Sequence, residues 1–206
     1  MRLALARWLN HGWHVPLDVT ARGLGTSAIH VEAGMFEIWL DLVDHRFLLR
    51  SSFAPERGFA LEPMSVAAFY RRAMAELAAA GIAVAIDVMP SEIADAVPFP
   101  EDAAHDADDA AAVTAFWRPL VPIDRVFRTF RTAFLGKASP VHFFWGSFDL
   151  AVTRFSGRPA PLHPGGVPGL PDAVSTYRAA AALGRWDDGL ECGVGAPGRP
   201  RPVAPR

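Results

Sequence analysis

Hydrophobic and polar positions alternate along residues 14–22 and 35–43, and this two-residue period predicts two strands that each bury one face. A short strand is expected at 28–31, between turns at Gly23, Gly25 and Gly34. Residues 46–52 return after a turn at Asp44 and His45, so the region is predicted to be an antiparallel meander. The side chains expected to face the core are Val15, Leu17, Val19, Ala21, Phe36, Ile38, Leu40 and Leu42.

Two helical regions follow the meander. Ser65 is placed to cap a helix that ends at Gly81, and 82–88 alternates again as a strand. Aspartates at 106, 108 and 109 favour the start of a second helix, which Pro119 and Pro122 should break or kink. A further helix is expected at about 123–135. The pattern predicts an α+β fold, with a mainly antiparallel twisted sheet and helices packed on one face.

The densest aromatic run is 139–158, SPVHFFWGSFDLAVTRFSGR. Two β-branched and aromatic segments flank Gly146-Ser147, a link typical of a tight hairpin. That turn would set Trp145 opposite Phe148 and Phe143 opposite Leu150. One long strand with a bulge at Gly146 is the alternative.

The hairpin register sorts the side chains onto two faces. One face is wholly apolar, and the other brings His142 and Asp149 together as diagonal neighbours. The apolar face is expected to hold Val141, Phe143, Trp145, Phe148, Leu150 and Val152.

The composition changes at Gly157. Residues 157–206 hold nine of the 18 prolines and nine of the 17 glycines, so they are expected to be mostly irregular, with a brief helix at 176–183. We therefore predict one α+β domain at 1–156 and a Gly/Pro-rich tail at 157–206.

Charge and cysteine usage narrow the classes of function. A formal net charge of −2 argues against a nucleic-acid or anionic-membrane binder, and no apolar run approaches a membrane span. Cys192 is the single cysteine, which fits a reducing compartment, so a cytoplasmic location is expected. A small molecule is the expected partner, while the cofactor and the oligomeric state stay open.

The histidines are the first candidates for chemistry. His14, His45 and His142 lie on or beside predicted strands, but their spacing matches no metal motif, so no metal site is predicted. His142 could act as a base oriented by Asp149, with Ser147 or Ser139 near, or the pair could be a structural hydrogen bond.

Arginines and aromatic residues are the other candidates. Arg46, Arg154 and Arg158 could clamp an anionic ligand, although an ion pair between Asp44 and Arg46 is the preferred interpretation of that turn. Aromatic side chains could line a pocket, but packing in the core is favoured for them. These aromatic residues are Trp13, Trp39, Phe143, Trp145 and Phe148.

These observations favour a small-molecule-binding domain with an aromatic pocket. A hydrolase-like enzyme using His142 and Asp149, and a structural module that binds a partner through the sheet, are the alternatives. The expected ligand-binding residues are His14, Trp39, His45, Arg46, His142, Asp149 and Arg154.

Three strings together carry a family resemblance: WLNHGWHVPLDVTARGL, FEIWLDLVDHRFLLRSS and SPVHFFWGSFDLAVTRFSGRPAPLHPGG. They resemble a bacterial family characterised only as a domain of unknown function, over roughly residues 1–169. The resemblance implies no activity, cofactor or catalytic residue. Members usually begin with another helical segment and continue into an acidic, aromatic C-terminal part, from which both ends of this chain depart. We therefore expect a shortened or frame-shifted end.

Overall fold

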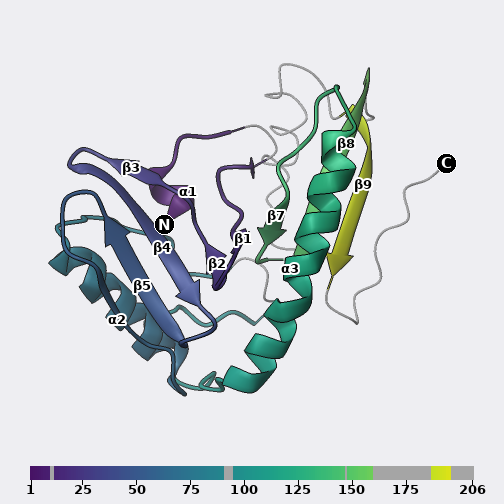
Figure 1. The fold of residues 1–206 in the computed structure, drawn as a ribbon. Coiled ribbons are helices and arrows are strands. Elements are labelled where there is room, and N and C mark those ends of the chain that lie inside the picture. The colour runs from purple at the N-terminus through teal and green to yellow at the C-terminus, as the bar shows by residue number, and fades with distance from the viewer. Residues whose placement is uncertain (10–11, 91–94, 147, 160–186, 196–206) are drawn as a thin grey trace.

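The computed structural model describes residues 1–9, 12–90, 95–146, 148–159 and 187–195, and within them it is a mixture of antiparallel strands and helices (Figure 1). The α+β prediction is therefore confirmed. The helices are α1 (Arg2–Leu5), α2 (Val66–Ala79) and α3 (Ala110–Thr132). The strands are β1 (Asp18–Thr20), β2 (Gly23–Gly25), β3 (Ile29–Val31), β4 (Gly34–Asp41), β5 (Arg46–Ser51), β6 (Arg57–Ala60), β7 (His142–Phe144), β8 (Asp149–Pro159) and β9 (Asp187–Gly195).

The first six strands form the predicted antiparallel meander. Their order is β1-β2-β4-β5-β6, and β3 pairs with the start of β4. Asp41 pairs with Arg46 at the β4–β5 turn, and His45 in that turn has a φ of 49°, as the residue types suggested. Phe36, Phe47 and Leu49 are buried on one inward face, because side chains two residues apart in a strand point to the same side and the β4–β5 register places these positions together.

The strands β7, β8 and β9 form a second antiparallel sheet. Phe143 pairs with Leu150, so the hairpin register predicted from Gly146-Ser147 is confirmed and the bulged alternative is wrong. Val141, Phe143, Leu150 and Val152 are buried together, again as expected. At the turn, Trp145 and Phe148 are less buried, at 39% and 52% exposure, but the Phe148 ring still packs on Phe143, as the predicted apolar face requires, and on Phe116 of α3. Phe148 has a φ of 55°, the left-handed conformation that a tight turn often requires.

One pair of residues joins the two sheets. Leu17 N donates to Phe143 O at 2.9 Å, and Phe143 N donates to Leu17 O at 2.7 Å. This reciprocal pair places the segment before β1 alongside β7 as another antiparallel neighbour. The strands therefore run in hydrogen-bonded succession from β9 through β7 and β1 to β6.

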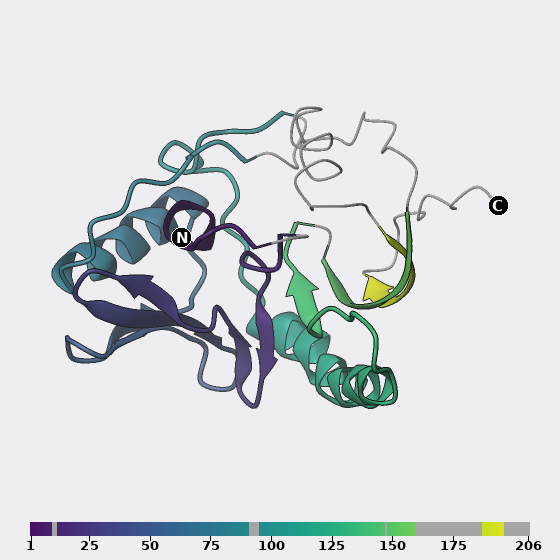
Figure 2. The ribbon, with the colours of Figure 1, turned by 90° about the horizontal axis from the view of Figure 1, so that it is seen from above.

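Helix α2 covers the β3–β6 part of the molecule. The Ser65 side chain accepts a hydrogen bond from Ala68 N at 3.2 Å, and Gly81 follows the helix with a φ of 78°, so both predicted ends are confirmed. Leu77 is fully buried and packs with Phe36 and Ile29 in one hydrophobic cluster. In Figures 1 and 2, α2 lies against the sheet at the side remote from α3.

Helix α3 is one continuous helix, which corrects the prediction of two helices. Pro119 and Pro122 both lie inside it, and Asp109 caps its start by accepting from Ala112 N at 3.0 Å. A proline inside a helix costs about 3 kcal/mol. Here Leu120 and Phe127, on either side of Pro122, are buried against β1, β2, β7 and β8, and this packing opposes a break.

The two hydrophobic clusters meet in the middle of the strands. Leu24 of β2 and Leu40 of β4 are direct cross-strand partners. Leu24 belongs to the cluster beneath α3, whereas Leu40 packs against the cluster beneath α2. A substitution of Leu24 or Leu40 should therefore alter the packing of both clusters.

Two further expectations need correction or limits. Residues 82–88 are not a strand: Ile82 is buried and the burial alternates, but the segment pairs with no described strand. Its two-residue period reflects extended chain packed on one side. In the predicted tail, β8 runs past 156 to Pro159, and β9 pairs with it. The expected helix at 176–183 lies outside the described residues.

Among the described residues, no helix combines the length and the hydropathy that crossing a membrane requires.

We expect Gly23→Ala to destabilise the protein more than Gly81→Ala. Both glycines have positive φ, 154° and 78°, which costs an alanine about 1–2 kcal/mol. A Cβ on Gly23 would also lie 1.9 Å from the Leu40 carbonyl oxygen, whereas a Cβ on Gly81 meets nothing within 4 Å. The free energy of unfolding in urea, measured for both variants, checks this. Equal losses would contradict the close packing of β2 on β4.

Candidate functional site

His142 is the most unusual side chain of the predicted polar face. Strand β7 alternates, so Phe143 points into the core beneath α3 and His142 points to the opposite side. The His142 side chain is nevertheless buried, at 4% exposure, and its ring lies edge-on to Phe144 with 4.3 Å between centroids. A buried imidazole normally has both nitrogens hydrogen-bonded, so its partners decide what it can do.

Only one ring nitrogen of His142 is hydrogen-bonded. Nδ1 lies 2.7 Å from the carbonyl oxygen of Pro140, which can only accept, so Nδ1 carries a proton. Nε2 is buried and has no hydrogen-bond partner among the described residues. Burial lowers the pKa of His142 below its usual value of 6.5, although Pro140, Asp149 and Asp18 act in the opposite direction. At neutral pH, Nε2 therefore presents an unused lone pair, the form of histidine that serves as a hydrogen-bond acceptor or a base.

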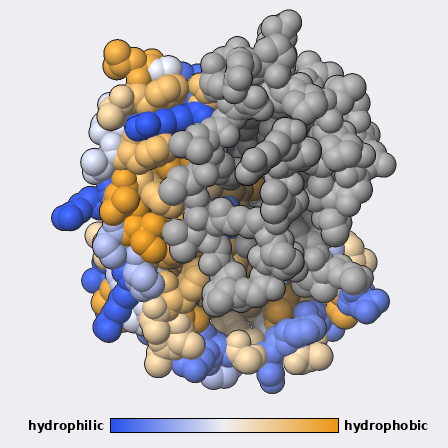
Figure 3. All heavy atoms as spheres, turned by 90° about the vertical axis from the view of Figure 1, so that its right-hand side faces the viewer, coloured by the Kyte–Doolittle hydropathy of each residue, from blue (hydrophilic) through white to orange (hydrophobic). Residues whose placement is uncertain are grey.

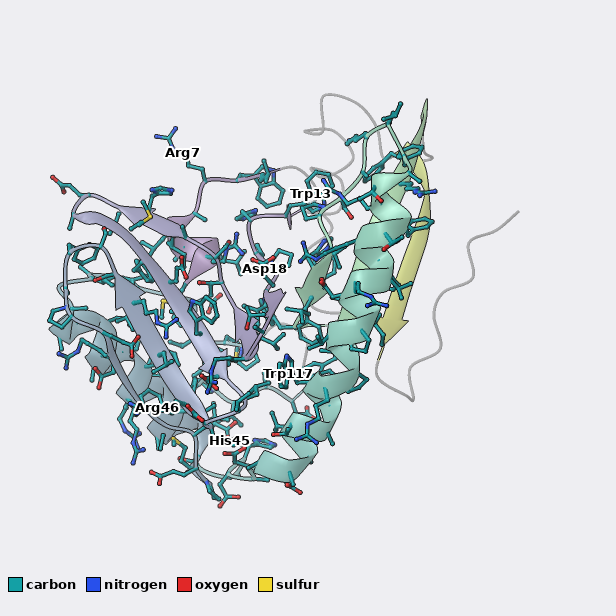
Figure 4. All side chains as sticks on the ribbon, in the orientation of Figure 1. Arg7, Trp13, Asp18, His45, Arg46 and Trp117 are labelled. Carbon is teal, nitrogen blue, oxygen red and sulfur yellow. The ribbon has the colours of Figure 1, made fainter. Side chains whose placement is uncertain are left out.

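Asp18 lies beside His142 because of the pair that joins the sheets. With Leu17 opposite Phe143, the antiparallel register sets Asp18 opposite His142, and Asp18 itself begins β1. Burial raises the pKa of the Asp18 carboxyl, while the charges of Arg2 and Arg128 lower it by less. In Figure 4, Asp18 lies between α1 and β7.

Arg2 completes this group from the N-terminal helix. Its Nη1 donates to the carbonyl oxygen of Pro16 at 2.7 Å, and its Nε is buried without a partner among the described residues. Burial lowers the pKa of Arg2, and the charge of Asp18 opposes that shift. We call Arg2, Asp18 and His142 the polar cluster. It contains a buried donor, a buried acceptor and a partly buried carboxyl.

Asp149 occupies the position that the hairpin predicts. It pairs with Phe144, while His142 pairs with Ala151, so Asp149 is the diagonal neighbour of His142. Its negative charge raises the pKa of His142 against the effect of burial. The two side chains are thus electrostatically coupled, but no direct hydrogen bond joins them in the described structure.

The serines suggested as partners of His142 give no nucleophile. The Ser139 hydroxyl donates to Pro140 O and accepts from Thr153 N, each at 2.8 Å, and the residue is 1% exposed. Ser139 therefore fixes the backbone where the chain enters β7. Ser147 lies outside the described residues.

The other histidine and arginine candidates have different partners. His14 lies in a turn rather than a strand; its Nδ1 accepts from Leu9 N at 3.3 Å and its ring packs on Trp8. His45 Nε2 lies 3.2 Å from the Thr114 hydroxyl of α3. Arg154 faces α3 instead of His142, with its guanidinium carbon 3.7 Å from the Phe130 ring centroid.

Trp39 and Arg46 lie on the β4–β5 hairpin. Trp39 Nε1 donates to Glu37 Oε2 at 2.7 Å, and the Arg50 guanidinium lies over the Trp39 ring. Arg46 is exposed beside a small polar cleft of about 260 Å³ that also involves Glu56 and Glu76. Figure 4 shows His45 and Arg46 at the lower end of the hairpin, well apart from Asp18 and Trp13. The expected ligand-binding residues, among them His14, His45, His142, Asp149 and Arg154, are thus not assembled around one pocket of the described structure.

The predicted ion pair of the β4–β5 turn is also different. Asp44 pairs with Arg22, at 2.6 Å, and not with Arg46. Arg22 also binds the buried Asp41 at 2.6 Å, and Asp41 accepts from Val43 N and Asp44 N. The hydrogen bond from Arg22 and those backbone bonds hold the pKa of Asp41 below its usual value despite its burial. These acids stabilise a turn.

A separate groove of about 640 Å³ lies over β4. Its lining is mostly aliphatic and includes Leu40, Leu42, Phe69 and Val113, with Asp106 and Asp108 at the rim. Sequence reasoning missed this groove, because its walls come from β4, α2, α3 and the loop before α3. Figure 3 views the molecule from the right-hand side of Figure 1, where hydrophobic and hydrophilic groups of the described residues lie next to one another.

Two members of the polar cluster were also missed as site residues. Asp18 falls at a polar position of the alternating segment before Gly23, which was a usable signal. Arg2 has no signal in the sequence, since its contact with Pro16 is set by the tertiary fold. Among the described residues, no group of three or more histidine, cysteine or acidic side chains is placed to hold a metal ion.

Comparison with known proteins identifies a family. The model of a family of unknown function, DUF5996, matches residues 1–176. No curated protein matches the chain. No solved structure matches it either.

Stability should fall in mild acid because of His142. The unfolded histidine binds a proton near pH 6.5, and the buried one only at lower pH, since burial lowers its pKa. Below pH 6.5 the unfolded state therefore binds more protons and gains stability, by at most about 1.4 kcal/mol per pH unit. Urea unfolding between neutral and mildly acidic pH should show a shallower loss in His142→Asn, whereas the exposed His30→Asn keeps the wild-type slope. If the stability of His142→Asn fell with pH in parallel with that of the wild type, the buried ring of His142 would not be neutral.

Proposed function

The chain belongs to this family of unknown function, and we propose that it is a small-molecule-binding protein whose ligand donates a hydrogen bond to Nε2 of His142. One observation carries the proposal: Nε2 is buried and has no hydrogen-bond partner among the described residues. Leaving a buried polar atom unpaired costs about 1–3 kcal/mol. A ligand that supplies a donor would recover that free energy on binding.

The chemistry of the polar cluster indicates the ligand class. His142 Nε2 can accept, and the Nε of Arg2 can donate, with the Asp18 carboxyl near both. A hydroxyl group meets both needs, because it donates one hydrogen bond and accepts another. The Phe144 ring against His142 would contact the carbon skeleton that carries the hydroxyl. We therefore expect a small hydroxylated molecule.

A hydrolase-like activity is the second candidate. The observation that favours it is the neutral tautomer of His142, which has an unprotonated Nε2 and Asp149 as an electrostatic neighbour. Such a ring could take a proton from a bound hydroxyl or water. The hydroxyl of Ser139 is already engaged by backbone groups, so this activity would use the ligand or water and not that serine.

Native mass spectrometry of the protein purified from its own host tests the binding proposal. We expect a small molecule to remain bound to the wild-type chain and to be lost from His142→Asn. Asparagine can keep the donation to Pro140 O, since its amide nitrogen occupies the place of Nδ1, but it has no atom at Nε2. His30→Asn, on the exposed side of β3, is the matched control and should retain the ligand.

Two results would contradict the proposal. One is a wild-type protein that carries no added mass. The other is equal ligand occupancy in the wild type and in a folded His142→Asn.

A further inference from the structure

The groove over β4 is a second feature, separate from the polar cluster, and it leaves hydrocarbon open to water. Leu40, Phe69 and Val113 are only partly buried, although they come from three different elements. The buried Leu42 also contributes to the lining. At about 640 Å³, the groove is within the size range of small-molecule sites, roughly 300–1,000 Å³.

The rim of the groove is acidic. Asp106 and Asp108 lie in the loop before α3, and neither forms an ion pair with a described residue. Glu62 is at the rim too, but Arg72 Nη1 pairs with it at 2.8 Å. His105, between the two sides, has its ring engaged by Asp102 at 2.9 Å. Asp106 and Asp108 therefore place negative charge, not paired with a described cation, beside exposed aliphatic surface.

We propose that this groove binds a small cationic amphiphile, with its hydrocarbon chain against Leu40, Phe69 and Val113 and its ammonium group near Asp106 and Asp108. Burying the chain removes apolar surface from water on both partners. The head group gains Coulomb attraction to two carboxylates that have no cation among the described residues. A fatty acid or alkyl sulfate would place its own negative charge beside theirs, so the groove discriminates against anionic amphiphiles.

The backbone around the groove keeps it open. His105 O accepts from Val66 N at 3.0 Å, and Asp102 O accepts from Ala67 N at 2.9 Å. These bonds satisfy amide groups at the start of α2 and fasten the acidic loop there. The loop thus forms a wall of the groove and is held away from its floor. This site does not depend on the function proposed for His142.

Calorimetric titration of the full chain with octyltrimethylammonium, 1-octanol and octyl sulfate, all below micellar concentrations, tests the proposal. We expect the cation to bind about tenfold more tightly than the neutral alcohol, and the sulfate to bind most weakly. In the double variant Asp106→Asn and Asp108→Asn, the cation should lose this advantage while the affinity for 1-octanol stays unchanged. Glu32→Gln, an exposed acid in the β3–β4 turn, is the control and should behave as wild type.

A variant that fills the groove tests the contribution of its apolar floor separately from that of its acidic rim. Val113→Trp should weaken all three ligands, because the larger ring occupies the space of the alkyl chain; far-UV circular dichroism checks that it folds. If 1-octanol binds but the cation binds no better, the charge selection is wrong. If no ligand binds, or if Val113→Trp changes nothing, the groove is not the site. His142→Asn should leave all three affinities as in wild type.

Discussion

The reciprocal hydrogen bonds between Leu17 and Phe143 are the constraint on which the rest of the structure depends. They join the two sheets through residues that lie more than a hundred positions apart in the chain. They also set the alternation of two segments at once: Leu17 and Phe143 turn inward toward α3, so Asp18 and His142 must face the other way. The polar cluster is therefore a consequence of how the core is packed. A shift of the register by one residue would turn every side chain to the opposite face, so it could not preserve the packed core and the polar cluster together.

His142 is buried, but within the described part of the chain its ring is only half hydrogen-bonded. The Pro140 carbonyl fixes one ring nitrogen, and burial favours the neutral ring. The second nitrogen has no hydrogen-bond partner among the described residues, and the Phe144 ring lies edge-on to the imidazole. A purely structural role would be filled as well by an apolar side chain, without the cost of the unpaired atom. Cores usually exclude such groups, and exceptions concentrate at binding and catalytic sites.

Local rules predicted the elements that local chemistry controls. Ser65 and Asp109 cap their helices, and the pairing of β7 with β8 follows the register predicted from the short link between them, because each of these features depends on neighbours a few residues away. Prediction failed where contacts between residues far apart in the sequence determine the local structure. The core beneath α3 holds a helix through Pro119 and Pro122, and no strand in the described part of the chain pairs with 82–88. For the site, alternation found His142 and Asp149 on one face, but Arg2 reaches the cluster only through its contact with Pro16.

The groove follows from how α2 and α3 begin. Each helix starts with amide groups that need acceptors, and the loop between them supplies some of these: its backbone carbonyls serve α2, and the Asp109 side chain serves α3. The loop is thereby fixed to both helix starts while Leu40 and Leu42 of the β4 region lie between them. Four of the loop side chains that line the groove are short (Ala104, Asp106, Ala107 and Asp108), and the ring of the fifth, His105, is engaged by Asp102, so the space above these leucines is not filled. The same capping that stabilises the two helices thus leaves an apolar groove with a negative rim.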